Sequence, residues 1–258
     1  MSSVDAVAAG PAERLIVSAA RLMAGRSTVF IGTGLPMLAA ALARRTCAPD
    51  LVAVFEFGGI GSPLERLPLG VGEARTFERA WAAEGLAGVM ETAQRGMVGD
   101  GFLGGAQVDA YGNLNTTVIG PHEKPRVRLP GSGGGNDVGA LCWRTVIVMR
   151  HERKRFVEKV DFVTTPGYLR GPGQRERAGL PPGTGPWRLL TDLALFDFPE
   201  RTRRARLIAL QPGATKEAVE AETGFQYDCL SDPGRLPEPT DAELRLLRDV
   251  IDPERAFL

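Results

Sequence analysis

Residues 27–56 follow a strand, turn, helix and strand pattern, which constrains the fold more than any other part of the chain. Two short runs rich in β-branched and aromatic side chains, 27–31 and 51–56, are typical of buried strands. The alanine-rich segment between them, 36–45, is typical of a helix. Two strands that are joined by a helix pair in parallel. The sequence therefore predicts an α/β fold with an open, mainly parallel sheet.

Further periodic segments supply helices for both faces of such a Rossmann-like sheet. Residues 11–23 carry apolar side chains at helical spacing. Helices are also predicted over 215–223 and 240–251. The last of them begins with a capping box, in which Thr240 and Glu243 satisfy each other's backbone N–H groups.

The second half of the chain predicts additional strands. Residues 145–149 have the composition of a buried strand, 187–198 that of a hairpin, and 205–210 that of another strand. The hairpin adds an antiparallel part to the parallel sheet. We expect residues 1–258 to form a single domain.

Three segments show no clear period. Residues 57–75 are rich in glycine and proline and are predicted to form a long loop. Residues 77–97 predict one or two short helices, interrupted at Gly85 and Gly88. Residues 164–186 contain so many glycines and prolines that they predict an ordered surface excursion or a subunit contact.

The charge composition excludes some classes of partner. Lys+Arg and Asp+Glu both number 31, so the formal net charge is zero. There is no basic excess that would favour nucleic acid or an anionic membrane as the main partner. No segment reaches the roughly 18 consecutive apolar residues that suggest a membrane-spanning helix. We therefore expect no nucleic-acid partner and no membrane partner.

Cysteine usage and the N-terminal residues indicate the compartment. Cys47, Cys142 and Cys229 lie far apart, with no CxxC pair, so neither a disulfide framework nor a zinc site is predicted. Asp5 and Glu13 occupy positions where a signal peptide has a basic or an apolar segment. We expect a soluble, cytoplasmic protein without a bound metal.

Glu56 ends the apolar run 51–56 and precedes Gly58, Gly59 and Gly61. A carboxylate at the end of a buried strand, beside a glycine-rich loop, lies where α/β proteins usually carry out their chemistry. Two interpretations remain open at this point. Glu56 is either a functional carboxylate or the solvated end of the strand, paired with one of the many arginines.

The Gly32-Thr33-Gly34 turn precedes a predicted helix, whose free N–H groups can hold a phosphate or a carboxylate. It is not a dinucleotide-binding fingerprint, because Met37 stands where that pattern needs its third glycine. A tight strand-to-helix turn without a ligand is an equal alternative.

Residues 102–120 predict a strand, a turn and a second strand, because the turn residues 109–113 tolerate positive φ. The amides of Gln107, Asn113 and Asn115 are suited to ligand binding. They are equally suited to satisfying the backbone of their own turn, and the sequence does not decide between the two.

The segment 130–137 is the most glycine-dense part of the chain. Successive glycines allow the backbone to approach a ligand closely or to direct several N–H groups at an anion. The alternative is a disordered linker. A predicted helix beginning at Asp137 follows the segment, so we expect an ordered loop between two core elements.

In their order along the chain, these parts resemble the β subunits of class I coenzyme A transferases, and among them the B-type subunits of glutaconate CoA-transferases. The resemblance covers nearly the whole sequence. It rests on TGLP (33–36), APDL (48–51), the Glu-x-Gly at 56–58, GGAQVDxYGNxN (104–115), GSGG (131–134), HERKRF (151–156), TTPGYLRGPGxRERxGLP (164–181) and IDPERAF (251–257).

The resemblance implies a covalent mechanism in which Glu56 is the nucleophile that attacks the thioester of an acyl-CoA. A free glutamate is ionised at neutral pH and needs no base for this attack. The resemblance also implies that a glycine-rich loop binds CoA and stabilises the oxyanion, namely Gly131, Ser132, Gly133, Gly134, Gly135 and Asn136. Candidates for substrate binding are Gln107, Asn113, Asn115, Gly32 and Gly34.

The same resemblance implies an α subunit that completes the active site, and CoA as a substrate with no further cofactor. The expected reaction moves CoA between a dicarboxylic or branched short-chain acyl-CoA and a carboxylic acid. Two alternatives use the same scaffold: an acyl-CoA hydrolase or decarboxylase subunit, and a non-catalytic CoA-binding subunit.

One departure from the family pattern concerns the neighbours of Glu56. Related transferases often have serine before the glutamate and asparagine after it, whereas this chain has Phe55 and Phe57, and Gly59 replaces a bulky apolar residue. The two aromatic rings predict more apolar surroundings for Glu56.

Overall fold

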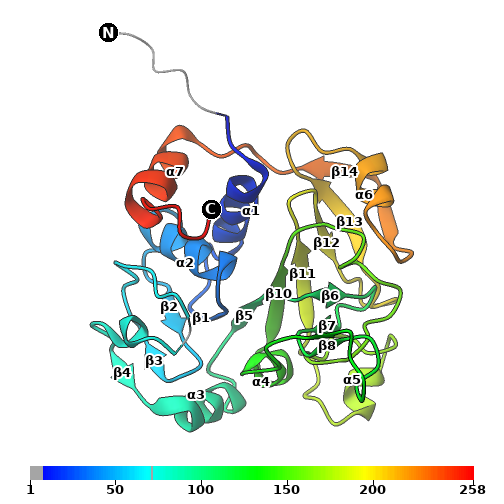
Figure 1. The fold of residues 1–258 in the computed structure, drawn as a ribbon, viewed down its shortest axis with the longest axis horizontal. Coiled ribbons are helices and arrows are strands. Elements are labelled where there is room, and N and C mark those ends of the chain that lie inside the picture. Colours follow the sequence, from blue (N-terminus) through cyan, green and yellow to red (C-terminus); the bar gives the residue numbers. More distant parts are fainter. Residues whose placement is uncertain (1–7, 71) are drawn as a thin grey trace.

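The computed structural model describes residues 8–70 and 72–258, so Asp5 and Val71 lie outside the described residues. Its centre is a ten-stranded sheet in the order β14-β13-β12-β11-β10-β5-β1-β2-β3-β4 (Figure 1). The parallel middle of the sheet consists of β11 (Pro186–Leu190), β10 (Arg144–Val148), β5 (Asp100–Leu103), β1 (Thr28–Ile31) and β2 (Val52–Val54). The predicted mainly parallel α/β sheet is confirmed.

Both ends of the sheet depart from this parallel pattern. At one end, β12 (Ala194–Asp197) is antiparallel to β11 and to β13 (Arg206–Leu210), as the predicted hairpin requires. The edge strand there, β14 (Asp228–Arg235), pairs with β13 through an irregular register. At the other end, the two-residue strands β3 (Gly59–Ile60) and β4 (Ala82–Ala83) are antiparallel additions.

Helices cover the two faces of the sheet, because side chains alternate between the faces along each strand. In β1, Val29 and Ile31 belong to one apolar core and Phe30 belongs to the other. The first core is covered by α1 (Pro11–Leu22), α2 (Leu35–Arg45) and the π-helical segment η2 (Leu246–Ile251) that continues α7 (Asp241–Arg245). The second is covered by α3 (Gly85–Gln94), α4 (Gly135–Leu141) and α6 (Lys216–Ala221). No helix in the described part of the chain is both long and apolar enough to cross a membrane.

Short elements complete the structure. The predicted strand-turn-strand segment forms β6 (Gln107–Val108) and β7 (Leu114–Asn115), which pair antiparallel. A second small hairpin consists of β8 (Val118–Ile119) and β9 (Val127–Arg128). The remaining elements are the 3-10 helix η1 (Ala74–Phe77) and the single turn α5 (Gln174–Arg177). The predicted capping box of Thr240 and Glu243 is present at the start of α7.

Three predictions about irregular segments need correction. The predicted loop 57–75 contains β3, and β4 follows it. Of the predicted helical segment 77–97, one short helix forms, α3; Gly85 begins it, Gly88 lies inside it without interrupting it, and the residues before Gly85 contain β4 instead of a helix. The segment 164–186 is not confined to the surface, because Arg175 is only 1% exposed.

Arg175 fixes the segment 164–186 to the body of the protein. Its guanidinium group has no carboxylate partner among the described residues and donates four hydrogen bonds instead. The acceptors are the carbonyl oxygens of Pro166 (2.7 Å), Gly167 (2.8 Å) and Gly139 (3.0 Å) and the hydroxyl of Thr184 (2.9 Å). Burial lowers the pKa of this arginine. The segment is therefore held by one buried cation among backbone carbonyls.

Candidate active site

Glu56 lies in the tight turn that connects β2 to β3. The N–H of Gly58 donates to the carbonyl of Phe55 (2.9 Å), and the N–H of Phe55 donates to the carbonyl of Gly59 (2.9 Å). Gly58 has φ +115°, and a Cβ atom there would lie 2.1 Å from the backbone nitrogen of Gly85. Only glycine fits this position. The turn therefore holds Glu56 at the carboxyl end of β2, where the sequence predicted it.

The glycine-rich loop lies directly against the Glu56 side chain. A Cβ atom added to Gly133 would lie 3.1 Å from Oε1 of Glu56. One added to Gly134 would lie 3.1 Å from Cγ of Glu56 and 2.7 Å from Cε of Met90. The close approach explains why this loop needs glycine. The structure thus brings together two features that are far apart in the sequence.

Two threonines brace this loop. The hydroxyl of Thr116 donates to the carbonyl of Gly131 (2.7 Å), and the N–H of Gly131 donates back to the carbonyl of Thr116 (2.9 Å). The hydroxyl of Thr165 donates to the carbonyl of Gly135 (3.0 Å), in the first turn of α4. The sequence analysis did not select these threonines, although Thr165 belongs to the TTPGYLRG segment. Their contacts join elements that no local pattern connects.

A cavity of about 480 Å³ opens beside Glu56 at the carboxyl ends of β1, β2 and β5. Its lining combines glycines, hydroxyl groups, a few apolar side chains and one arginine. The lining residues are Gly32, Thr33, Glu56, Leu103, Gly104, Gly105, Ala106, Thr116, Leu129, Pro130, Gly131, Ser132, Gly133, Gly135, Arg155 and Thr165. In the described part of the chain, no hydrogen bond or salt bridge engages the Glu56 carboxylate. The carboxylate is partly exposed and available for a reaction.

The aromatic neighbours of Glu56 do not make its cavity more apolar. Phe55 is fully buried in the core beneath α1 and α2. Phe57 is 49% exposed and lies against Gly72. Neither ring lines the cavity. The prediction that Phe55 and Phe57 make the surroundings of Glu56 more apolar is therefore wrong for the cavity side of this residue. The two side chains point away because Glu56 occupies a turn in which successive residues face different directions.

The three predicted amides do not line this cavity. Asn115 donates to Gln107 (2.7 Å) and to the carbonyl of Val118 (2.6 Å), and Gln107 donates to Asp161 (3.1 Å). The carbonyl oxygen of Asn113 accepts hydrogen bonds from the N–H groups of Gly167 (2.9 Å) and Leu169 (3.1 Å). All three amides are buried and bind other parts of this chain. Their geometry supports the turn-stabilising interpretation.

Asn113 also anchors the turn through Asp109. Its amide nitrogen lies 2.8 Å from Oδ2 of Asp109, a buried carboxyl whose pKa is raised to about 6 by burial. Hydrogen bonds from the turn oppose this shift only in part. Asp109 does not line the Glu56 cavity, so we assign this pair to the folding of the turn.

The two glycines of the Gly32-Thr33-Gly34 turn have different positions. Gly32 lines the Glu56 cavity, and its N–H donates to the carbonyl of Phe102 (2.9 Å). Gly34 precedes α2 with φ +75° and does not line that cavity. Asn136 lies in α4 and does not line it either. The turn and the loop therefore contribute some of their predicted residues to the site and leave others outside it.

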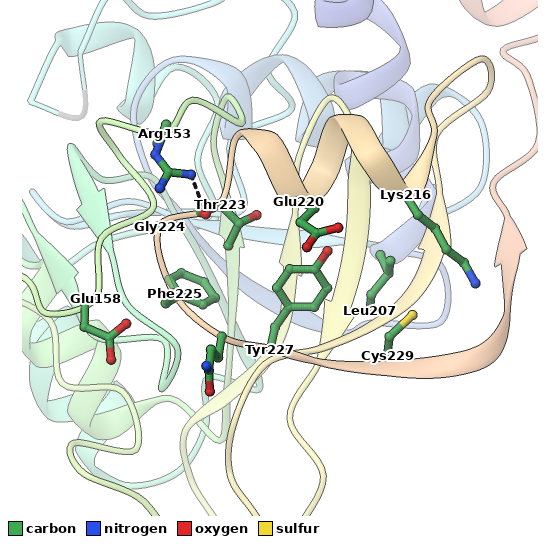
Figure 2. A pocket seen from close by; sticks show the side chains of 11 residues that line it. Arg153, Glu158, Leu207, Lys216, Glu220, Thr223, Gly224, Phe225, Tyr227 and Cys229 are labelled. Atoms are coloured by element: carbon green, nitrogen blue, oxygen red, sulfur yellow. Dashed lines mark hydrogen bonds between the residues drawn. The ribbon is translucent and has the colours of Figure 1, made fainter.

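A larger cavity, with a volume of about 700 Å³, lies elsewhere. Figure 2 shows it beneath α6, with Lys216, Glu220, Tyr227 and Cys229 around it and Arg153 bonded to the backbone at Thr223. It lies at the β13–β14 end of the sheet, remote from β2. The lining mixes acidic and basic side chains without a feature that selects one ligand. We therefore place the candidate active site at Glu56 because of the chemistry of its residues, although the cavity there has the smaller volume of the two.

Substitution of Gly134 by valine is expected to lower any catalytic activity that depends on Glu56 about a hundredfold, because a displacement of the reacting group by about 1 Å has this effect. The new side chain would collide with Met90 and push the Glu56 carboxylate away. Steady-state kinetics will measure the loss. Gly70→Ala is the matched control, since a Cβ atom there meets nothing within 4 Å. Equal activity of Gly134→Val and the wild type would show that the loop does not position Glu56.

Comparison with known proteins adds independent evidence. The family model described as "Coenzyme A transferase" matches residues 12–222. The chain is 38% identical to the B-type subunit of glutaconate CoA-transferase from Acidaminococcus fermentans, over 95% of this chain and 94% of that protein. The crystal structure of that transferase superposes with a TM-score of 0.91 and covers 96% of this chain and 97% of the matched chain, at 36% identity.

Two other relatives carry different names. The chain is 37% identical to the B-type subunit of 3-oxoadipate CoA-transferase from Pseudomonas knackmussii, over 92% of this chain and 91% of that protein. It is 30% identical to the cholesterol ring-cleaving hydrolase IpdB subunit of Rhodococcus jostii, over 94% of this chain and 92% of that protein. One scaffold therefore serves transferases and a hydrolase.

Proposed function

The chain belongs to the coenzyme A transferase family and is a CoA-transferase subunit of the B type, and from this premise we propose its reaction. The assembled enzyme moves CoA between an acyl-CoA and a carboxylic acid through a thioester on Glu56. The observation that carries this proposal is the Glu56 carboxylate, which has no partner among the described residues and lies against the glycine-rich loop. A carboxylate in this state is ready to act as a nucleophile.

The proposed reaction proceeds by successive acyl exchanges. A carboxylate oxygen of Glu56 attacks the thioester carbonyl carbon, the C–S bond breaks, and an anhydride and the CoA thiolate form. The thiolate then attacks the glutamyl carbonyl carbon, which releases the acyl group as a free carboxylate and leaves CoA on Glu56. A second carboxylic acid reverses these two steps. No oxidant and no net proton is consumed, so the energy of the thioester is retained.

Each attack produces a negatively charged oxygen that needs hydrogen-bond donors. The backbone N–H groups of Ser132, Gly133 and Gly134 have no acceptor among the described residues. They are therefore free to stabilise this oxyanion and to hold the thioester of CoA. Thr116 and Thr165 position the loop for this role through their hydrogen bonds.

An α subunit is proposed to complete the site. The anhydride must be kept from water, yet Glu56 is partly exposed in this chain. The turn of Glu56 and the segments that pair with it or pack against it carry three large apolar side chains, with exposed fractions of 49% (Phe57), 71% (Trp81) and 52% (Leu86). Large exposed apolar groups mark contact surfaces. The relatives at 38% and 37% identity are both named as one subunit of their transferase, which is consistent with a partner chain here.

The proposed substrate is the CoA thioester of a dicarboxylic or branched short-chain acid. The two transferase relatives are named for glutaconate and 3-oxoadipate, both of which are dicarboxylates. The hydroxyl groups of Thr33, Thr116 and Ser132 give the cavity hydrogen-bonding capacity suited to a polar acyl group.

Hydrolysis of an acyl-CoA is the second candidate. It is favoured by the similarity to a subunit of a hydrolase and by the partial exposure of Glu56, which admits water. In that case Glu56 acts as a general base, and no covalent adduct accumulates.

Intact-mass spectrometry tests the proposal. The chain, co-expressed with an α subunit, is incubated with a panel of acyl-CoAs in the absence of an acceptor acid. Transfer predicts a mass increase of one CoA, linked as a thioester to Glu56 and absent from Glu56→Ala. Consumption of acyl-CoA without an adduct would favour hydrolysis, and neither adduct nor turnover would leave a non-catalytic CoA-binding subunit.

A further inference from the structure

A cavity of about 280 Å³ lies at the opposite end of the parallel strands from Glu56. Its lining includes Arg144, the first residue of β10, and Pro186, the first residue of β11. Glu56, in contrast, follows the carboxyl end of β2, in the same parallel part of the sheet. The five residues of β10 alone span about 16 Å, so this cavity is separate from the candidate active site. We call it the amino-end cavity.

Aromatic side chains form one part of the lining of the amino-end cavity. They are Trp143, Tyr168, Trp187 and Phe198. Tyr168 and Phe198 are buried, and their ring centroids lie 5.8 Å apart. Trp143 is 49% exposed, yet its ring N–H donates to the carbonyl of Gly96 (2.9 Å), which holds the ring in place. The cavity therefore offers a fixed indole ring that is accessible to a ligand.

The rest of the lining carries more positive than negative charge. One carboxylate, Asp197, lines the cavity together with three arginines, Arg144, Arg188 and Arg203. Asp197 accepts two hydrogen bonds from Arg206, at 2.9 and 2.7 Å. Arg144 binds both carboxylate oxygens of Asp100, at 2.9 and 3.0 Å. The two carboxylates are thus each bound by an arginine other than Arg188.

Arg188 is a half-buried cation that forms no salt bridge among the described residues. It is directly opposite Asp197 in the pairing of β11 with β12, but Asp197 binds Arg206 on β13. Its guanidinium group lies 4.1 Å from the ring centroid of Trp187 and donates to the carbonyl of that residue (2.9 Å). Burial lowers the pKa of Arg188; Asp197 raises it, and the positive charges of Arg26 and Arg206 lower it further. An anion beside this guanidinium would offset both the burial and the repulsion.

Arg203 is a second cation with a weak partner. It lies 3.8 Å from Glu200, whose side chain is 92% exposed. Such an exposed pair contributes little, so a bound anion can replace Glu200 at small cost. The Arg203 guanidinium also lies 4.7 Å from the ring centroid of Tyr168, which keeps it at the cavity.

We propose that the amino-end cavity binds a small aromatic anion, that is, a phosphoryl or carboxyl group attached to a single aromatic ring. Arg188 and Arg203 bind the anionic group, because the guanidinium fork matches the oxygens of a phosphate or a carboxylate. Trp143 packs against the ring of the ligand. Pockets for drug-sized ligands begin at about 300 Å³, so a volume of about 280 Å³ fits one ring with one anionic group. This proposal does not depend on the reaction at Glu56.

Isothermal titration calorimetry with phenyl phosphate and benzoate tests the proposal on the complex of this chain with an α subunit. Arg188→Gln and Arg203→Gln are each expected to raise the Kd of the tighter probe about tenfold or more. Trp143→Leu is expected to raise it as well, through loss of the ring contact. Arg201→Gln is the matched control, because that exposed arginine does not line the cavity, and it should leave the Kd unchanged.

The two probes also identify the anionic group, because the one that binds more tightly carries the preferred group. Circular dichroism checks that each variant is folded, and Arg203→Gln serves if Arg188→Gln is not. Absence of binding by both probes, or an unchanged Kd in both arginine variants, would overturn the proposal. Inorganic phosphate that binds as tightly as phenyl phosphate would also overturn it, since the ring would then contribute nothing.

Discussion

Replacement of Glu56 by glutamine is expected to reduce CoA transfer by the assembled enzyme by about four orders of magnitude or more, as loss of a covalent nucleophile does in other enzymes. The amide has nearly the same shape as the carboxylate but cannot attack a thioester. The described structure shows no hydrogen bond or salt bridge of this side chain that the substitution would break. The free energy of unfolding should therefore stay within about 0.5 kcal/mol of the wild-type value.

Steady-state kinetics and chemical denaturation of the same preparations measure both parts of this prediction. Glu91→Gln is the matched control, because that side chain is 67% exposed on α3 and, in the described part of the chain, makes only a long contact of 3.9 Å with Arg95. The control should retain wild-type activity. Retention of a tenth or more of the activity in Glu56→Gln would show that Glu56 is not the nucleophile.

Replacement of Arg175 by methionine is expected to lower the free energy of unfolding by about 3 to 5 kcal/mol, in the range reached when a buried polar network is broken. Methionine fills a similar elongated space but donates no hydrogen bond. Three carbonyl oxygens and the Thr184 hydroxyl would lose the donors that Arg175 now supplies. Because the segment 164–186 also carries Thr165, which braces the glycine-rich loop, activity should fall as well.

Urea denaturation compares this variant with Arg177→Met, which changes an exposed arginine in the same helical turn. The Arg177 variant should stay within about 0.5 kcal/mol of the wild type. Arg175→Lys should give an intermediate loss, since one ammonium group cannot reach all four acceptors in the fork-like geometry of arginine. A loss below about 1 kcal/mol in Arg175→Met would mean that the segment is held mainly by its other contacts.

The sequence predicts those parts of the fold that depend on local pattern. The strand, turn, helix and strand over 27–56 predict a parallel pair, and β1 and β2 are parallel. The strands β3 and β4 could not be predicted from the sequence pattern, because each has only two residues, too few to show a period. Their pairing places Glu56 in a hairpin turn, which a glycine-rich stretch does not reveal by itself.

Arg175 shows a second limit of sequence-based prediction. A charged residue between glycines and prolines is normally exposed, since burial of an isolated charge is costly. In the folded chain four acceptors surround its guanidinium group, and one of them, the carbonyl of Gly139, lies 36 residues earlier in the chain. A contact of this kind leaves no periodic signature in the sequence.

Some residues of the candidate site could be predicted from the sequence and others could not. Glu56 and the glycine-rich loop could be selected because their residue types are unusual for their positions, and the structure places them in contact. The amides of Gln107, Asn113 and Asn115 could not be assigned, because ligand binding and turn stabilisation require the same groups. Only the hydrogen bonds of the folded chain distinguish the two uses.

The two edge strands of the sheet affect whether this chain aggregates before it binds a partner. Open strand edges invite pairing with other chains and lead to aggregation. One edge here is β4, with two residues, and the other is β14, which carries Pro233 and leaves regular register with β13. Short length, proline and irregular pairing each discourage the addition of a foreign strand. The newly made chain is therefore protected from self-association at both edges of its sheet. Its exposed apolar side chains stay in contact with water until a partner binds them.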